Sequence, residues 1–260
     1  MNIFDGSFAP AWTKNEMKED TEDVAIYHGI LSDLQIKNAM KNGAIVIHPY
    51  NEGQLNNTSY DVCLGGEGFY RRTRKVTTNS YDNLTDNDVR TLWNEKYSKE
   101  MKADHVDMLN PWDTESLRKY WGEVQTPVEV NDAAGVKQNI IMLRPRETIL
   151  CHTEEFIGGC IRLTTKLQAK SSMTRCCLSI SGSGGVGDIG YVNRWMMVIQ
   201  NTSDELVPLI VGKPVAQILF KMSGPTLNTY HLKGKYQDSD DFQTTKANWK
   251  IENILPKAKK

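Results

Sequence analysis

The sequence lacks any long apolar run. No stretch approaches the roughly 20 apolar residues that a helix needs to cross a bilayer. The N-terminal region also lacks the basic start and apolar centre of a secretory signal peptide. We therefore expect a cytoplasmic protein with no membrane partner.

An excess of charge of either sign is also missing. Lys and Arg number 31 against 32 for Asp and Glu, which gives a formal net charge of −1 at pH 7. A chain balanced in this way exerts no long-range attraction on nucleic acid or anionic lipid, so we expect no nucleic-acid partner. The balance is compatible with a local phosphate site, which needs only a few well-placed donors.

Cysteines are few and irregularly spaced. There are five, and an odd number without a pattern favours a reducing compartment over a disulfide framework. His152-x-Glu154 matches the first half of a zinc deaminase signature, but the adjacent Cys176 and Cys177 lack the two-residue spacer of the second half. We predict no protein-held metal and place His152 at a strand edge.

What the sequence does contain is a β-protein pattern. Between residues 138 and 233, short apolar runs alternate with turn residues, which predicts a sandwich or barrel. The runs that we expect to be strands are NIIML, TILCH, IRLTTKLQA, WMMVIQN, LVPLIV and VAQILFKM. Upstream, a further strand is expected over 44–49, and residues 58–76 predict a hairpin interrupted by glycines.

Three other regions differ from this pattern. Ser32 and Gln35 form a capping box for a short helix that Gly43 ends. Residues 78–135 are rich in Asn, Asp, Lys, Tyr and Trp, and two segments, DNDVRTLWNEKYSKEM and TESLRKYWGEV, favour helices, so we expect a partly helical insertion. The last residues, 238–260, form a polar tail that we expect to be mobile.

A glycine-rich loop stands between two of the predicted strands. Gly182-x-Gly184-x-x-Gly187 has the spacing of a dinucleotide-binding loop, but that motif requires a helix directly after it. The residues that follow form a strand-like run instead, and no Gly-Lys-Ser/Thr is present for a phosphate-binding P-loop. We therefore interpret the loop as a hairpin turn.

Four separated segments carry a family resemblance. TSYDVCLG (58–65), AKSSMTR (169–175), GVGDIGY (185–191) and GKPVAQILF (212–220) occur in the order of the motifs of the trimeric dUTPase and dCTP deaminase superfamily, which the chain resembles. The helix and strand before them, and GKYQ near the C-terminus, look like the deaminase branch.

The resemblance implies an architecture. We expect a mainly β fold, a distorted β-barrel or jelly roll of the dUTPase type, with a few short helices. One domain would span 30–237, with the insertion at about 78–135, an N-terminal extension over 1–29 and the tail from 238. The family assembles as a homotrimer with its sites between subunits. Mg²⁺ would be held mainly by the substrate's phosphates.

The resemblance also implies roles for particular residues. Donors of the second and last motifs would hold the triphosphate, backbone of the glycine loop would read the base, Asp188 would activate a water, and Tyr191 would cover the deoxyribose. The predicted nucleotide-binding residues are Lys170, Ser171, Ser172, Gly182, Gly187, Asp188, Tyr191, Gln217, Lys235 and Tyr236. The predicted catalytic residues are Asp188, Arg175 and Ser171.

One position separates hydrolysis from deamination. Aligned without gaps from Asp188, Val198 stands where the deaminase branch carries a catalytic Glu, and valine cannot move protons. We therefore predict a pyrimidine deoxynucleoside triphosphate diphosphohydrolase that converts dUTP to dUMP and pyrophosphate. Two alternatives stay open: a divergent dCTP deaminase, which Arg175 and GKYQ favour, and an inactive nucleotide-sensing or protein-binding member.

Overall fold

The computed structural model describes residues 29–72, 114–180, 184–228, 230, 234–237 and 239–257. The helix predicted over DNDVRTLWNEKYSKEM and the role predicted for Gly182 fall outside these residues.

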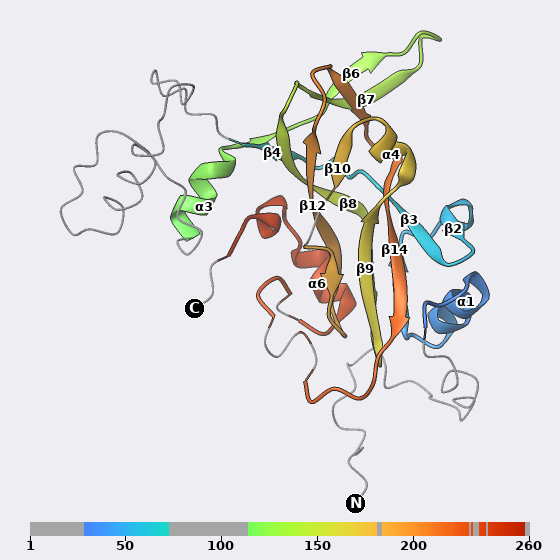
Figure 1. The fold of residues 1–260 in the computed structure, drawn as a ribbon. Helices are drawn as coiled ribbons and strands as arrows, with labels where there is room; N and C mark the ends of the chain where they lie inside the picture. Colours follow the sequence, from blue (N-terminus) through green and yellow to red (C-terminus); the bar gives the residue numbers. More distant parts are fainter. Residues whose placement is uncertain are drawn as a thin grey trace, which may run out of the picture.

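Antiparallel strands form three sheets (Figure 1). The six-stranded sheet has the order β10 (Leu178–Ile180), β12 (Val192–Asn201), β8 (Thr148–Gly159), β4 (Phe69–Arg71) and β5 (Val124–Gln125), and β1 (Ile45–His48) pairs with β8. The five-stranded sheet has the order β11 (Val186–Gly187), β9 (Leu163–Ala169), β14 (Pro214–Met222), β3 (Ser59–Cys63) and β2 (Leu55–Asn56). The small sheet has the order β13 (Val207–Ile210), β7 (Lys137–Leu143) and β6 (Val128–Asn131).

One apolar core joins the two larger sheets. Its most buried members include Tyr60, Ile149, Leu163, Met197 and Phe220, each no more than 1% exposed and drawn from both sheets. Burial alternates along β9 and β12, as expected of strands with one face on a core. The mainly β fold is confirmed, and each of the six predicted strand runs overlaps a strand of the structure.

The predicted helices that the structure describes are also confirmed. α1 (Asp33–Lys41) begins with the expected capping box, in which Gln35 N donates to Ser32 Oγ and Ser32 N donates to Gln35 Oε1. It ends before Gly43, whose φ of 71° no branched residue adopts readily. α3 (Thr114–Trp121) lies in the predicted insertion and buries Trp121. None of the helices in the described part of the chain has the length and apolar character needed to cross a membrane.

The hairpin predicted over residues 58–76 is wrong, because its two strands belong to different sheets. β3 is buried along its whole length between β14 and β2, whereas β4 pairs with β8 and β5. The glycines between them allow a crossover: Gly65 N donates to His152 O at 2.9 Å, and a Cβ at Gly65 would collide with the His152 ring. Glycines are therefore needed here because the two sheets approach closely, and in the sequence such glycines look the same as those of a hairpin turn.

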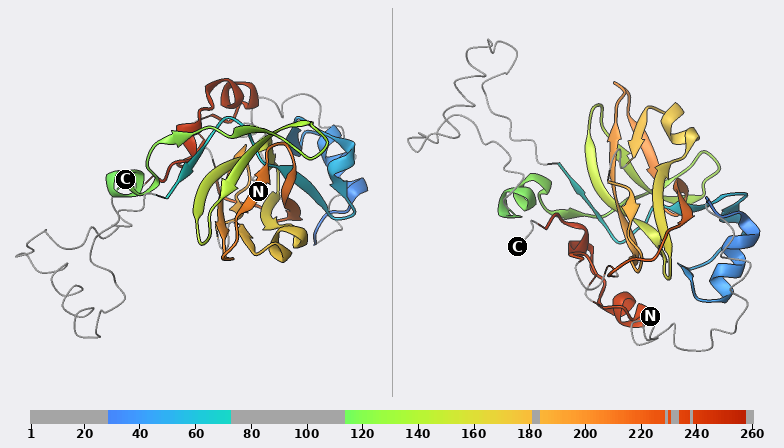
Figure 2. Two further views of the ribbon diagram at one scale, coloured as in Figure 1. Left: turned by 90° about the horizontal axis from the view of Figure 1, so that it is seen from above. Right: turned by 60° about the horizontal axis from the view of Figure 1, so that its bottom comes forward.

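The polar tail also differs from its prediction, because residues 239–257 are folded. α6 (Phe242–Asn248) begins with Asp241, whose carboxylate accepts from Thr244 N at 2.7 Å. A 3₁₀ helix, η5 (Ile251–Ile254), follows. Both pack beside the six-stranded sheet (Figure 2), because a few apolar residues are spread through an otherwise polar segment.

Candidate functional site

The glycine-rich loop passes from one sheet to the other. β10 pairs with β12 in the six-stranded sheet, whereas β11 pairs with β9 in the five-stranded sheet. The two strands that flank the loop do not pair with each other, so the hairpin that we predicted there is wrong. The loop places the residues after it at the junction of the two sheets.

Close approach of other parts of the chain, and not positive φ, explains Gly185 and Gly187, whereas a Cβ at Gly184 would meet nothing within 4 Å. A Cβ at Gly187 would collide with Thr165 Oγ1 and the Trp195 ring, and one at Gly185 would lie 2.6 Å from a carbonyl oxygen of β9. The positive φ of this region is at Gly190, at 88°. The Gly187 carbonyl accepts a hydrogen bond from Thr165 Oγ1 at 3.3 Å.

Asp188 and Tyr191 lie at the two ends of one tight turn. Tyr191 N donates to Asp188 O at 3.0 Å, and the Asp188 side chain is exposed. The Tyr191 ring makes edge contacts with Trp195 and Tyr230, with ring centres 5.4 and 4.9 Å apart. Burial raises the pKa of the Tyr191 hydroxyl, so this ring stays neutral and offers a fixed aromatic surface.

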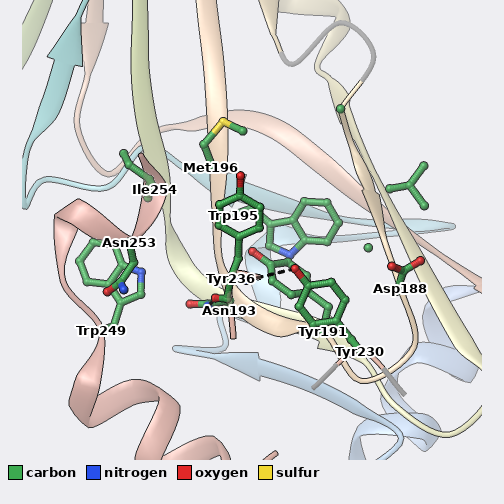
Figure 3. A pocket seen from close by; sticks show the side chains of 13 residues that line it. Asp188, Tyr191, Asn193, Trp195, Met196, Tyr230, Tyr236, Trp249, Asn253 and Ile254 are labelled. Carbon is green, nitrogen blue, oxygen red and sulfur yellow. Dashed lines mark hydrogen bonds between the residues drawn. The ribbon is translucent and has the colours of Figure 1, made fainter. Parts of the chain in front are cut away.

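These residues line a cavity of about 210 Å³, which we call the Tyr191 pocket. In Figure 3, Asp188, Tyr191 and Tyr230 lie on one side and Trp249, Asn253 and Ile254 on the other. Pockets for complete small ligands are usually about 300–1,000 Å³, so this pocket has room for only part of a nucleotide. Its lining residues are Gly184, Val186, Gly187, Asp188, Tyr191, Asn193, Trp195, Met196, Tyr230, Tyr236, Trp249, Asn253 and Ile254.

The segment GKYQ holds this turn in place. Gln237, 5% exposed, accepts from Val192 N at 2.8 Å and donates to Gly190 O at 3.0 Å, so its amide binds the backbone on both sides of Tyr191. Tyr236, a predicted nucleotide-binding residue, lines the pocket. Lys235 does not line it, and its ammonium group donates to the carbonyl of Lys257 at 3.0 Å.

The predicted phosphate donors and the predicted catalytic residue Arg175 form a second group, which we call the Lys170 group: Lys170, Ser171, Ser172, Arg175 and Gln217. Lys170 directly precedes a short helix, α4 (Ser171–Arg175), so the sequence KSS starts a helix. The Ser171, Ser172 and Arg175 side chains are exposed.

Neighbouring strands hold the remaining members of the Lys170 group. The Lys170 ammonium group pairs with Asp61, whose carboxylate also accepts from Asn56 Nδ2 at 3.0 Å. Gln217 lies opposite Asp61 in the pairing of β14 with β3, and its amide oxygen accepts from Ser59 Oγ at 3.1 Å. Three of the four motifs therefore meet on adjacent strands.

The Tyr191 pocket and the Lys170 group do not meet within one chain. On β9, Thr165 pairs with Gly187, whereas Lys170 follows the far end of the same strand. Five residues of extended chain span about 17 Å. No member of the Lys170 group lines the Tyr191 pocket.

Comparison with known proteins identifies the family. The family model described as dCTP deaminase-like matches residues 30–223. The chain belongs to the dCTP deaminase-like family. A "dCTP deaminase, dUMP-forming" of Corynebacterium jeikeium is 26% identical over 228 residues, which cover 86% of this chain and all of the relative. The superfamily resemblance seen in the sequence is thus confirmed.

Solved structures of this superfamily align with the chain as well. The dCTP deaminase of Agrobacterium tumefaciens aligns with a TM-score of 0.43 at 14% identity, over 77% of this chain and 50% of that one. The EIAV dUTPase aligns with a TM-score of 0.30 at 20% identity, over 41% of this chain and 92% of that one.

Position 198 lies in apolar surroundings. Val198 pairs with Leu150 of β8 and packs against an apolar cluster that also contains Trp121 and Ile254. Among the described residues that line the Tyr191 pocket, the acidic one is Asp188. The position at which we expected the proton-transferring Glu of a deaminase is occupied by a valine in an apolar cluster.

The zinc alternative finds no support in the geometry. His152 is fully buried within β8, so its predicted place at a strand edge is wrong, whereas Cys176 and Cys177 are exposed. The described residues contain no group of three or more His, Cys, Asp or Glu side chains able to hold a metal ion.

Several pocket residues were missed by the sequence reasoning. Asn193, Trp195 and Met196 follow the last recognised motif directly, on β12, and a longer motif boundary would have included them. Trp249 and Ile254 come from the segment predicted to be a mobile tail. Their only sequence signal is that they are large apolar residues in a polar background.

Proposed function

We propose that this protein hydrolyses a pyrimidine deoxynucleoside triphosphate between its α- and β-phosphates, converting dUTP to dUMP and pyrophosphate. The proposal rests on two facts taken together. Asp188 and Tyr191 are present and line the pocket, and Val198 lies in an apolar cluster. Hydrolysis needs a base for water and donors for phosphate, and the chain has both. Deamination needs a proton carrier beside the base, and Val198 cannot be one.

The geometry supports a division of roles. The Tyr191 ring, fixed by Trp195 and Tyr230, would pack on the deoxyribose and exclude a 2′-hydroxyl. The exposed carboxylate of Asp188 would accept from the 3′-hydroxyl and take a proton from the attacking water. The Lys170 group would bind the phosphates through an ammonium group, hydroxyls, a guanidinium and an amide. Pyrophosphate would leave with the electrons of the broken P–O bond.

A complete site requires two copies of the chain in this proposal. The two groups of residues are about 17 Å apart along β9, and Ser171 and Ser172 are exposed and do not line the pocket of their own chain. Closed rotational symmetry would bring the Lys170 group of one subunit to the Tyr191 pocket of the next. A homotrimer satisfies this requirement.

The residues present fit a Mg²⁺ ion that the substrate carries. Mg²⁺ is commonly bound through one or two carboxylates plus substrate phosphates, with waters completing its shell. The Tyr191 pocket offers one exposed carboxylate, that of Asp188. When bound, the ion would neutralise charge that develops on the phosphate oxygens.

The second candidate function is deamination of dCTP. It is favoured by the match to the dCTP deaminase-like family and by the relative from Corynebacterium jeikeium. The name of that relative, "dCTP deaminase, dUMP-forming", combines deamination of dCTP with formation of the monophosphate. Our proposal is that this chain carries out only the second of these changes, the cleavage between the α- and β-phosphates.

One assay separates these functions. The protein is incubated with dUTP, dCTP, dTTP or UTP, with Mg²⁺ or with EDTA, and monophosphate, pyrophosphate and ammonia are quantified. We expect pyrophosphate from dUTP with Mg²⁺ only, none from UTP, and no ammonia from dCTP. Ammonia release would replace the proposal with the second candidate. Nucleotide binding without any product, unchanged in Asp188→Asn, would indicate an inactive sensor.

A further inference from the structure

The folded C-terminal segment 239–257, which we call the C-terminal strap, supplies one wall of the Tyr191 pocket. Trp249, Asn253 and Ile254 line the pocket on the side that faces Asp188 and Tyr191 (Figure 3). The family match ends at residue 223, so this wall lies outside the family motifs.

Arg194 holds the start of this wall. It lies on β12 between the pocket residues Asn193 and Trp195, and its guanidinium carbon is 4.6 Å from the centre of the Trp249 indole. The same group lies 5.1 Å from the Phe156 ring centre. A guanidinium placed on aromatic faces in this way is attracted by their π electrons, more strongly when it is shielded from water.

Two polar contacts fix the orientation of the Arg194 guanidinium. Its Nη1 pairs with Glu67, and its Nε donates to the carbonyl of Glu154 at 3.1 Å. The Arg194 side chain is only 14% exposed. A planar group bound along its edge leaves its faces free for stacking, which a lysine ammonium group cannot reproduce.

His152 supports Trp249 from a second direction. The two ring centres are 4.8 Å apart, and the imidazole is fully buried. Nδ1 lies 2.8 Å from the carbonyl oxygen of Thr153, so Nδ1 carries the proton and donates. Nε2 lies 3.3 Å from Glu67 Oε2, yet it is the one buried side-chain polar atom in the described residues without a hydrogen-bond partner. Such an atom is costly to bury and calls for an explanation.

The far end of the wall lies in an apolar cluster against which Trp249 also packs. Ile254 is 4% exposed and belongs to an apolar cluster with Tyr70, Trp121 and Leu150. Residues 249–254 are thus held by Arg194 and its partners and by an apolar cluster that joins β4, β8 and α3.

We infer that Arg194 is a positioning residue of the Tyr191 pocket: together with Glu67 and His152 it holds Trp249 as the pocket wall, and nucleotide affinity depends on that contact. The inference rests on the proposed function in one respect, namely that the pocket binds the nucleoside. It explains why His152 Nε2 is tolerated without a partner: the imidazole is retained for its contact with Trp249. Arg194 itself does not line the Tyr191 pocket.

The test compares Arg194→Ala and Arg194→Lys with Arg146→Ala. Arg146 is a matched control, because it forms an exposed ion pair with Asp204 at 2.9 Å, away from the pocket residues. Hydrogen exchange of residues 242–254 is measured without nucleotide. Binding of the α,β-imido analogue of dUTP is measured by calorimetry, and KM and kcat are measured with dUTP.

We expect faster exchange in the strap and about tenfold weaker analogue binding in Arg194→Ala, because stacking on aromatic rings is lost. KM should rise by a similar factor while kcat changes little, because Asp188 and the Lys170 group are untouched. Arg194→Lys should recover only part of the affinity, and Arg146→Ala should match the wild type. A double variant, Arg194→Ala with Trp249→Ala, should bind no more weakly than Trp249→Ala alone.

Unchanged strap exchange in Arg194→Ala would overturn the inference, and so would additive losses in the double variant. These results differ from a failure of the proposed function. If the wild-type protein binds no pyrimidine nucleotide, the proposed function falls, together with the part of the inference that concerns affinity. The exchange comparison then still decides whether Arg194 holds the strap.

Discussion

The Tyr191 pocket and the Lys170 group carry the two halves of the proposed chemistry, and they differ in how completely one chain builds them. The pocket is surrounded by aromatic rings and held by Gln237 and the C-terminal strap. In the Lys170 group, Ser171, Ser172 and Arg175 point into solvent at a helix of five residues. The base and sugar would meet a preformed surface, whereas the phosphates would meet donors that become a site only beside another subunit.

The largest expected effect is on the pocket half. Asp188→Asn should lower kcat for dUTP by about 10²–10⁴-fold, because the variant cannot take a proton from water. Analogue binding and thermal stability should stay near wild type, since the Asp188 side chain is exposed. Retention of full activity would exclude Asp188 as the base.

A mixture of two variants, one altered in the Tyr191 pocket and one in the Lys170 group, tests whether a complete site takes these two parts from different subunits. Asp188→Asn and Ser171→Ala are each expected to be strongly impaired alone. Co-refolded in equal amounts as random trimers, they should recover about a quarter of wild-type activity, because that share of interfaces joins two intact halves. Mixed trimers as inactive as their parents would show that each site lies within one chain.

Val198→Glu probes the difference between the pocket and a deaminase site. The carboxylate would enter an apolar cluster, and we expect a loss of roughly 2 kcal/mol in the free energy of unfolding by urea. No ammonia should be released from dCTP. Val128→Glu is the matched control, because Val128 is a strand valine that is 63% exposed, and it should leave stability almost unchanged.

The smallest effect concerns the support of the Lys170 group. Glu155, 2% exposed, accepts from Cys63 N at 2.9 Å and from Gln54 Nε2 at 2.6 Å behind the strand that carries Asp61. Burial raises the pKa of Glu155 above its ordinary 4.5, so the folded state holds its proton more tightly than the unfolded state does. Stability therefore falls as the pH rises from below 4.5 through the folded-state pKa.

Glu155→Gln should remove the pH dependence of stability that Glu155 causes. We expect the variant to be about 1 kcal/mol less stable than wild type at low pH, because one oxygen acceptor is lost, and the difference should shrink as the pH rises. Urea unfolding at a series of pH values measures both. Parallel curves for the two proteins would contradict the expectation.

The sequence predicted those parts of the fold that are determined by neighbouring residues, such as helix caps and alternating strands. The capping box at Ser32 and the alternation along β9 and β12 need only neighbouring residues, and the structure has both. The crossover at Gly65 was mistaken for a hairpin, because a glycine that avoids a collision looks like one that makes a turn.

The site could be predicted only where a motif carried it. Asp188, Tyr191 and Tyr236, which the motifs singled out, line one pocket, but the division between that pocket and the Lys170 group depends on which strands pair. The contact of Arg194 with Trp249 joins residues far apart in sequence that have no shared pattern. Such contacts follow from the packing of the strap and leave no local signal.

A substitution at Gly65 is expected to affect the pocket although Gly65 does not line it. It closes the first motif and packs directly against the His152 ring, which in turn supports Trp249. A side chain at position 65 would collide with the imidazole that contacts Trp249. A random screen for substrate-binding defects would then recover a substitution in a crossover between two sheets, at a residue that does not line the Tyr191 pocket. Gly65 therefore acts as a steric spacer between the first motif and the pocket wall.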